Sequence, residues 1–150
     1  MSGAGFVVDV GTPLPPEVVW ARLWDLQRHT EVIPLTTVTT VPAGAALRSG
    51  VEFCGRTGLG PLGFDDTMRV TQWRPPTGND HGLAVVEKTG RVLGGRIRAE
   101  VTRDGSGSRI RWRQDLRLPW LPASLRPLES VAARLAAPGY RQVITRLLTS

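Results

Sequence analysis

Residues 96–118 read RIRAEVTRDGSGSRIRWRQDLRL, and this stretch decides the fold class. Apolar and polar residues alternate on both sides of Asp104-Gly105-Ser106-Gly107, a run of residues typical of a turn. A period of two is the pattern of a β-strand with one covered face. The stretch therefore predicts a hairpin of two antiparallel strands, whose other face carries arginines and meets water.

Shorter alternating runs on the N-terminal side extend the predicted sheet. Residues 35–41, 51–54, 64–71 and 83–87 each read as a strand, and Phe6–Val10 reads as a first strand that stops at Gly11. Between the first two strands, Pro16 and the apolar spacing after it predict a helix to about Leu26. A second short helical or turn segment follows over residues 28–33, and we expect about seven strands in all.

A long C-terminal helix is predicted from Pro127 to about Leu148. Its predicted buried stripe consists of Leu128, Val131, Leu135, Val143 and Leu147. Such a helix would span about 33 Å, enough to cross the sheet. Pro138 and Gly139 predict a kink or a break in the middle, and we expect an apolar cavity at that interruption.

Length and composition indicate one folding unit over residues 1–150. Cys54 is the only cysteine, so no disulfide can form within the chain, and a cytoplasmic location is expected. No stretch is long and apolar enough to predict an integral membrane segment. The net charge is +6, but all 19 basic residues except Lys88 are arginine, a skew typical of a GC-rich genome, and we expect no nucleic-acid partner.

The predicted order of elements resembles the helix-grip superfamily, which includes START-like lipid-transfer domains, pollen-allergen-type proteins and polyketide cyclase or aromatase-like proteins. The resemblance rests on residues 16–25, residues 60–66 and the hairpin around Asp104-Gly105. It implies an α+β fold in which a curved antiparallel sheet wraps a long C-terminal helix, with two short helices after the first strand. It also implies a hydrophobic ligand, without naming it.

Polar residues on the expected covered face are the most informative candidates for a site. Asp66, Gln72, Glu87 and Gln114 share the parity of their apolar neighbours. A lone buried carboxylate is costly, so each must pair, protonate, reach water or meet a ligand. The alternatives are a β-bulge that turns the residue outward, or a buried hydrogen-bond partner such as Tyr140 or an arginine. The predicted ligand-binding residues are Phe53, Phe64, Asp66, Met68, Val85, Glu87, Trp112, Gln114 and Leu135.

Three residues are candidates for proton transfer if the cavity is catalytic: Asp66, Glu87 and His29. His29 lies between the opening helix and Pro34, where it could face the cavity mouth, and an ordinary surface position is the alternative. One cysteine and two distant histidines offer no metal-ligand spacing, so no metal is expected. No cofactor is expected either.

One motif is rejected on structural grounds. Residues 58–63 match the G-x-G-x-x-G fingerprint of dinucleotide binding. That fingerprint requires a helix after the glycines, whereas here a strand follows and Pro61 lies inside the loop. The glycines are interpreted as a tight connection between two strands.

Three functions therefore remain open. The first is binding, and transport where needed, of a hydrophobic small molecule such as a lipid, quinone or polyketide. The second is a polyketide cyclase or aromatase that uses cavity carboxylates for acid/base chemistry. The third is an interaction module whose arginine-rich sheet face docks to an acidic partner or makes transient contact with an anionic membrane.

Overall fold

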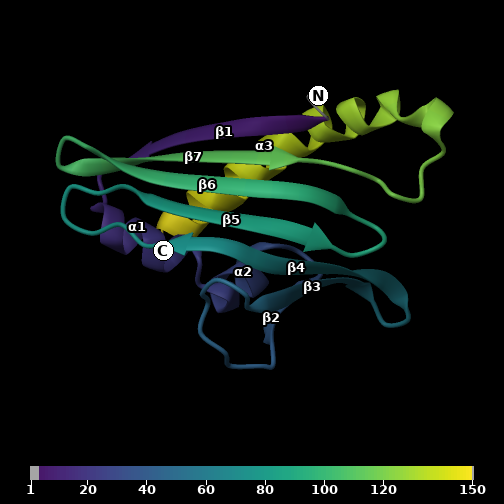
Figure 1. Cartoon of the computed structure of the whole chain (residues 1–150), viewed down its shortest axis with the longest axis horizontal. Coiled ribbons are helices and arrows are strands. Elements are labelled where there is room, and N and C mark those ends of the chain that lie inside the picture. The colour runs from purple at the N-terminus through teal and green to yellow at the C-terminus, as the bar shows by residue number, and fades with distance from the viewer. Residues whose placement is uncertain (1–3, 150) are drawn as a thin grey trace.

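The fold consists of one seven-stranded antiparallel sheet and three α-helices in residues 4–149, which are the residues described by the computed structural model (Figure 1). The strands are β1 (Gly5–Thr12), β2 (Thr36–Val41), β3 (Glu52–Leu59), β4 (Leu62–Arg74), β5 (Gly82–Thr89), β6 (Gly94–Asp104) and β7 (Gly107–Asp115). The helices are α1 (Pro16–Leu23), α2 (Leu26–Val32) and α3 (Pro127–Thr149), with a 3₁₀ turn, η1 (Ala123–Leu125), before α3. The sheet order is β1-β7-β6-β5-β4-β3-β2.

The α+β helix-grip architecture predicted from the sequence is confirmed. Figure 1 shows α3 lying across one face of the curved sheet. α3 packs against β1, and α2 packs against β2 at the opposite edge of the sheet. α1 contacts α3 and the strands β6 and β7. One face of the sheet is therefore covered by helices that come from both ends of the chain.

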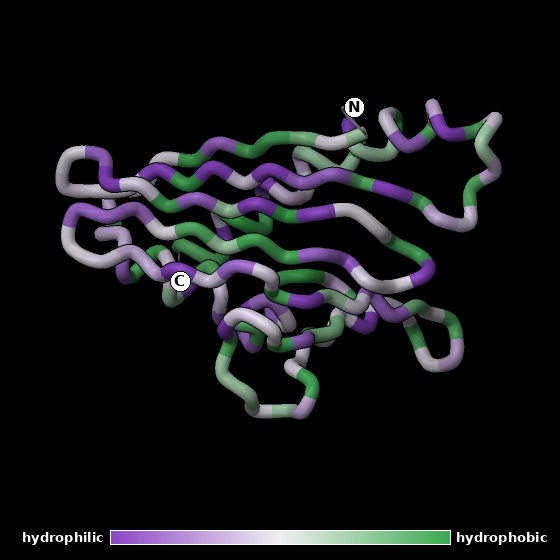
Figure 2. Tube along the Cα trace, in the orientation of Figure 1, coloured by the Kyte–Doolittle hydropathy of each residue, from purple (hydrophilic) through white to green (hydrophobic). Residues whose placement is uncertain are grey.

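The β6–β7 hairpin forms as its alternation predicts. Ile97, Ala99 and Val101 are buried, and Trp112 pairs with Ala99 across the two strands. Figure 2 shows the alternation of hydrophilic and hydrophobic residues along these strands. The intervening arginines face solvent on the outer side of the sheet.

A β-bulge in β4 reverses the facing of the residues that follow it. The register with β5 shifts between Val70 and Gln72. Val70 is buried, Gln72 is exposed, and Trp73 packs against the core. The bulge is one of the alternatives that the sequence leaves open for Gln72, and it brings Trp73 to the covered face.

The β5 strand is buried on both faces, so its sequence does not show which residues point to the covered side of the sheet. Ala84, Val86 and Lys88 point to the covered side, while Val85 and Glu87 point to the outer side. The Glu87 side chain is 46% exposed and forms a 2.7 Å ion pair with Arg96. The placement of Val85 and Glu87 on the covered face was therefore wrong.

Over the first half of α3, the helix face that packs against the sheet is opposite to the predicted one. Ala133 is fully buried, and Ala132, Ala136 and Ala137 pack against the core. Leu128, Val131 and Leu135 are exposed instead. The small alanine side chains let the helix lie close to β1, so the larger residues occupy the outer face.

The helix is not broken at its proline. α3 runs from Pro127 to Thr149 with Pro138 inside it, and both Pro138 and Gly139 are exposed. The sequence predicts a kink or a break at this position, and the break is wrong. Proline on the solvent side loses one backbone hydrogen bond, while the residues around it keep packing against the sheet.

Candidate functional site

A pocket of about 300 Å³, here called the inner pocket, lies between the sheet and the C-terminal half of α3. Apolar and aromatic side chains dominate its wall. They are Trp24, Leu26, Ile33, Pro34, Val38, Phe53, Phe64, Met68, Leu93, Ile97, Trp112, Val143, Ile144 and Leu147. The rest of the wall is formed by His29, Thr36, Gly55, Thr57, Asp66, Lys88 and Tyr140.

A buried ion pair lies on this wall. Lys88 Nζ donates to Asp66 Oδ2, and the same nitrogen lies 3.7 Å from Met68 Sδ. The Lys88 side chain is only 1% exposed. Pairing compensates much of the cost of removing both charges from water. The pocket therefore contains a pair whose formal charges cancel.

The second carboxylate oxygen of Asp66 is left without a partner. Asp66 Oδ1 is buried and accepts no hydrogen bond from any residue in the range 4–149. A buried acceptor without a donor typically costs about 1–3 kcal/mol. A ligand in the inner pocket with an N–H or O–H group would relieve that cost.

Gly55 leaves room opposite this carboxylate. Gly55 on β3 pairs with Asp66 on β4, and both face the inner pocket. A Cβ atom at Gly55 would lie 3.9–4.0 Å from Thr36, Met68 and Val38, which is ordinary contact. The missing side chain therefore widens the pocket beside Asp66 without any backbone requirement for glycine.

Gln114 supports the wall from behind. Trp112 Nε1 donates to Gln114 Oε1 at 3.1 Å, and Gln114 Nε2 donates to the Tyr140 hydroxyl at 3.3 Å. Gln114 is 1% exposed, yet it does not line the inner pocket. Its amide links β7 to α3 and orients two aromatic side chains that do line it.

His29, on α2, lies on the pocket wall. The Asp25 carboxylate caps α2 by accepting hydrogen bonds from the backbone of Gln27 and Arg28, and this fixes the start of the helix that carries His29. His29 Nε2 donates to the Leu23 carbonyl at 2.7 Å. Burial lowers the pKa of His29 below 6.5, although the Leu23 carbonyl and the Asp25 carboxylate act in the opposite direction.

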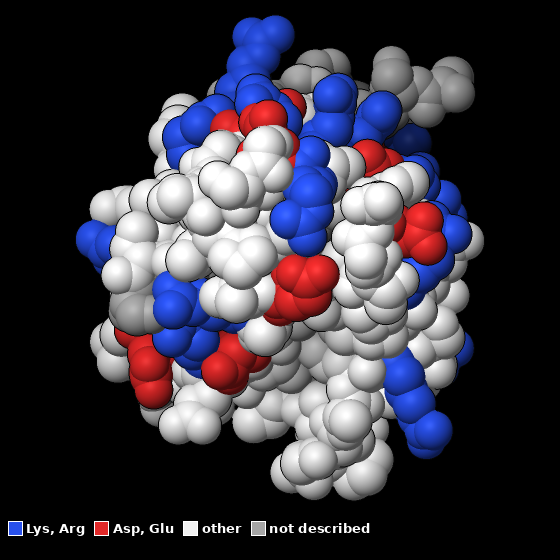
Figure 3. All heavy atoms as spheres, turned by 90° about the vertical axis from the view of Figure 1, so that its left-hand side faces the viewer, with Lys and Arg blue, Asp and Glu red and all other residues white. Residues whose placement is uncertain are grey.

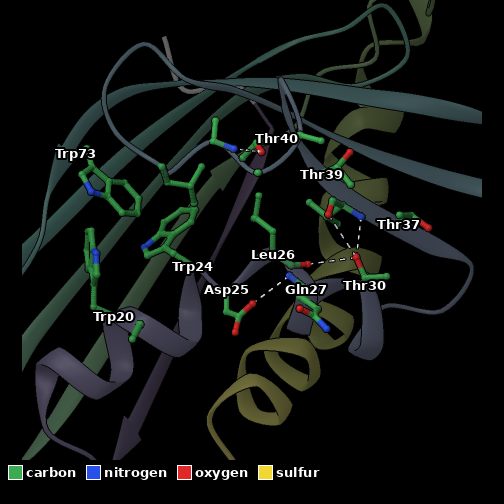
Figure 4. Close-up of a pocket in the computed structure, with 16 residues that line it drawn as sticks. Trp20, Trp24, Asp25, Leu26, Gln27, Thr30, Thr37, Thr39, Thr40 and Trp73 are labelled. Carbon is green, nitrogen blue, oxygen red and sulfur yellow. Dashed lines mark hydrogen bonds between the residues drawn. The ribbon is translucent and has the colours of Figure 1, made fainter.

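A second, more open hollow of about 650 Å³, the outer groove, lies between α1, α2, β2 and the β2–β3 loop (Figure 4). Trp24, Leu26 and Val38 border both the outer groove and the inner pocket. Trp20 and Trp73 stand beside Trp24, with ring centroids 4.9–6.1 Å apart. Trp24 also stacks on Trp112 at 5.8 Å, so an aromatic wall separates the two hollows.

The predicted ligand-binding residues divide into two groups. Phe53, Phe64, Asp66, Met68 and Trp112 all line the inner pocket, as does His29. Val85, Glu87, Gln114 and Leu135 do not line it. Leu135 is 78% exposed because it lies on the face of α3 opposite Ala133, so its placement in the cavity was wrong.

Lys88 is the most important wall residue that the sequence analysis missed. The residues before it on β5, Leu83 to Val86, are apolar on both faces, so the strand shows no alternation that would fix its facing. The one available signal is compositional, because Lys88 is the only lysine among 19 basic residues. Because lysine occurs nowhere else in the chain, its use at position 88 suggests that this position needs a lysine.

The remaining motifs have structural explanations. Residues 58–63 form the tight end of the β3–β4 hairpin, as interpreted from the sequence. Gly58 has a φ of +145°, and a Cβ there would lie 2.2 Å from the Leu62 carbonyl oxygen. Among residues 4–149, no three His, Cys, Asp or Glu side chains converge to hold a metal ion. No helix in that range is both long and apolar enough to cross a bilayer.

Solved structures share this fold at low sequence identity. TTHA0849 from Thermus thermophilus aligns with a TM-score of 0.72 and 13% identity, over 96% of this chain and 94% of that one. Ara h 8.0201 aligns with a TM-score of 0.62 and 10% identity, over 97% and 98%. DynU16, from the dynemicin biosynthetic locus, aligns with a TM-score of 0.58 and 17% identity, over 98% of this chain and 46% of its own.

Neither a family model nor a curated protein matches the sequence. At identities of 10–17%, the structural likeness establishes the helix-grip fold and leaves the activity to be argued from the site.

Proposed function

We propose that the protein binds a hydrophobic small molecule in the inner pocket. The observation that carries this proposal is the combination of a largely apolar wall with one buried, unpartnered acceptor, Asp66 Oδ1. Pockets of about 300–1,000 Å³ with a few polar groups in an apolar wall are typical of small-molecule sites. Buried acceptors without a donor are uncommon in folded proteins, and a bound ligand is one explanation for this one.

The chemistry of the wall restricts the ligand. The charges of Asp66 and Lys88 cancel, so a neutral ligand suits the pocket better than an ion. Asp66 Oδ1 selects a ligand with an N–H or O–H group at one end, and Phe53 and Trp112 favour an aromatic or alicyclic body. The pocket volume of about 300 Å³ equals the space of roughly ten water molecules, which limits the ligand to a compact ring system.

A polyketide cyclase or aromatase is the second candidate, and one observation favours it. Asp66 and His29 line the same pocket, and burial lowers the pKa of His29, which keeps its imidazole available as a base. DynU16, which shares the fold, comes from a biosynthetic locus. In this reading Asp66 and His29 move protons on a bound polyketone, while Glu87 has no role because it faces outward.

The binding proposal is tested with N-phenyl-1-naphthylamine, a neutral aromatic probe that has one N–H donor and fluoresces in apolar surroundings. We expect the wild-type protein to bind it and Gly55→Leu, which fills the space opposite Asp66, to bind at least about tenfold more weakly. Gly11→Leu is the matched control, because Gly11 also lies in a strand but faces open space. Equal affinity of Gly55→Leu and wild type would refute the site.

A separate assay distinguishes the two candidates. A linear poly-β-ketone thioester is incubated with wild type, Asp66→Asn and His29→Gln, and its cyclisation is followed by mass spectrometry. Turnover by wild type that either substitution abolishes, while the naphthylamine probe still binds, identifies an enzyme. Probe binding without turnover leaves the binding protein.

A further inference from the structure

An apolar stripe lies on the outer face of the first half of α3. It consists of Leu125 on η1 and Leu128, Val131 and Leu135 on α3, whose side chains are between 45% and 78% exposed. The last three follow helical spacing, so they lie along one line of the surface. Scattered exposed leucines are ordinary, whereas three large apolar residues in a row on one helix face, with a fourth just before it in the sequence, indicate an interaction surface.

The stripe has no role in the core. The opposite side of the same helix, with Ala132, Ala133 and Ala136, makes the contacts with the sheet. The positions of the stripe are in contact with water, so polar residues there would serve the fold equally well. The helix is apolar on two faces, and no residue in the range 4–149 buries the second one.

Charge around the stripe indicates which partner it fits. Residues 116–150 contain five arginines and one acidic residue, Glu129. The Glu129 carboxylate accepts a 2.6 Å hydrogen bond from the Leu118 backbone, so it is engaged within the protein. Arg126 and Arg134 lie beside the stripe in the sequence and are exposed. A second copy of the chain would bring these arginines together, whereas an anionic surface would attract them.

The positive charge elsewhere on the protein is more nearly balanced, because residues 1–115 contain 14 basic (19 − 5) and 12 acidic (13 − 1) residues. On the outer face of the sheet, Arg56, Arg69, Arg96 and Arg98 form ion pairs with carboxylates of the same sheet. At the end of the molecule that carries α1, acidic and basic side chains also lie interspersed (Figure 3). The α3 region therefore differs from the rest of the surface in having arginines with so few acidic neighbours.

We propose that the apolar stripe docks on an anionic lipid bilayer, with α3 lying in the plane of the interface. An apolar helix face flanked by arginines is the pattern of a helix that binds at the membrane surface without crossing it. Trp120, on the connection before η1, is 61% exposed, and tryptophan is a residue favoured at the lipid–water boundary. The arginines bind the headgroups and the stripe enters the acyl boundary.

This docking face is new relative to the sequence analysis, which placed membrane contact on the arginine-rich sheet face. The proposal does not depend on the function of the inner pocket, because the stripe lies on the outer face of the first half of α3 and the pocket borders the second half. Its failure and the failure of the ligand site are therefore distinguishable, and stripe variants should bind N-phenyl-1-naphthylamine like wild type.

The test is co-sedimentation with vesicles of phosphatidylcholine, with and without about one third phosphatidylglycerol. We expect wild type to bind the anionic vesicles, and to bind neutral ones at least about tenfold more weakly. Leu128→Gln/Leu135→Gln should weaken binding to anionic vesicles more than about tenfold, because it removes apolar surface from the interface. Glutamine keeps the helix propensity of leucine, so folding is preserved.

Two further variants complete the test. Arg126→Gln/Arg134→Gln should weaken binding to anionic vesicles about fivefold or more and reduce its dependence on salt. Val18→Gln/Val41→Gln is the matched control, because both valines are exposed but lie on α1 and at the end of β2, outside the stripe. Undiminished binding of the leucine variant, or equal binding of wild type to neutral vesicles, would overturn the proposal. So would a dimer in sedimentation velocity that the leucine variant converts to monomer.

Discussion

Lys88 on β5 donates a hydrogen bond to Asp66 on β4, and the two side chains form the only ion pair on the wall of the inner pocket within residues 4–149. The side chains of the other ion pairs in that range are all at least 28% exposed, and pairs near the surface contribute little. Among the described residues, the buried pair is the only charged pair on a wall that is otherwise mostly apolar. We therefore expect it to affect both the stability of the protein and the choice of ligand in the proposed site.

Breaking this pair from one side should be costly. Lys88→Met leaves a carboxylate buried without its cation, and Asp66→Leu leaves the ammonium without its anion, so each should lower the free energy of unfolding by about 3 kcal/mol or more. The double variant should be more stable than either single one. Urea unfolding of wild type, the two single variants and the double variant measures the coupling energy between Lys88 and Asp66. If the losses of the two single variants add up in the double variant, the predicted coupling is absent.

Stability should fall as the pH is lowered because of His29. The pKa of His29 is lowered below 6.5 in the folded protein by burial, so between the lowered value and 6.5 the unfolded chain binds more protons. The contribution is fully present above about pH 6.5 and is lost as pH falls through the folded pKa. His29→Gln should reduce the pH dependence of the free energy of unfolding between about pH 7.5 and 5. If the slope with pH is the same in the variant, other titrating groups cause the pH dependence.

The thiol of Cys54 should react slowly with disulfide reagents. Burial raises the pKa of Cys54, and the nearby carboxylates of Asp65 and Asp66 raise it further. The pH midpoint of its reaction with dithiobis-nitrobenzoate should therefore lie above that of glutathione. Asp65→Asn removes one of these charges and should move the midpoint down, while an upward move would contradict the electrostatic explanation.

Gly95 should not tolerate alanine. It has a φ of +118°, and a Cβ there would lie 2.1 Å from the Asp115 carbonyl oxygen on the neighbouring strand. Gly95→Ala should cost roughly 2–4 kcal/mol or prevent folding, because backbone must move. Gly11→Ala, with open space around its Cβ, should change stability by less than about 1 kcal/mol. Thermal unfolding of both variants compares them directly.

The sheet could be predicted from the sequence wherever one face meets water. On β6 and β7, arginines mark the wet face of each strand, so the facing of Ile97 and Trp112 follows from alternation alone. The same reasoning predicted the positions of Phe53, Asp66 and Met68 on the pocket wall.

The facing could not be predicted where alternation is lost. β5 is apolar on both faces over Leu83 to Val86, so alternation assigned Glu87 to the wrong side and missed Lys88. The bulge after Val70 reverses parity without any glycine or proline to signal it. On α3, hydrophobicity favours leucine over alanine at a buried face, whereas the close approach to β1 requires the smaller residue. These are effects of tertiary packing, which a local pattern does not contain.

The position of Lys88 also provides a direct report on global unfolding. A protease specific for lysine can cut this chain only after residue 88, because no other lysine is present. That bond lies inside β5, which pairs with β4 and β6, so it becomes accessible only when the sheet opens. Cleavage into fragments 1–88 and 89–150 would therefore measure the population of the unfolded state in native buffer, and a bound ligand would slow it.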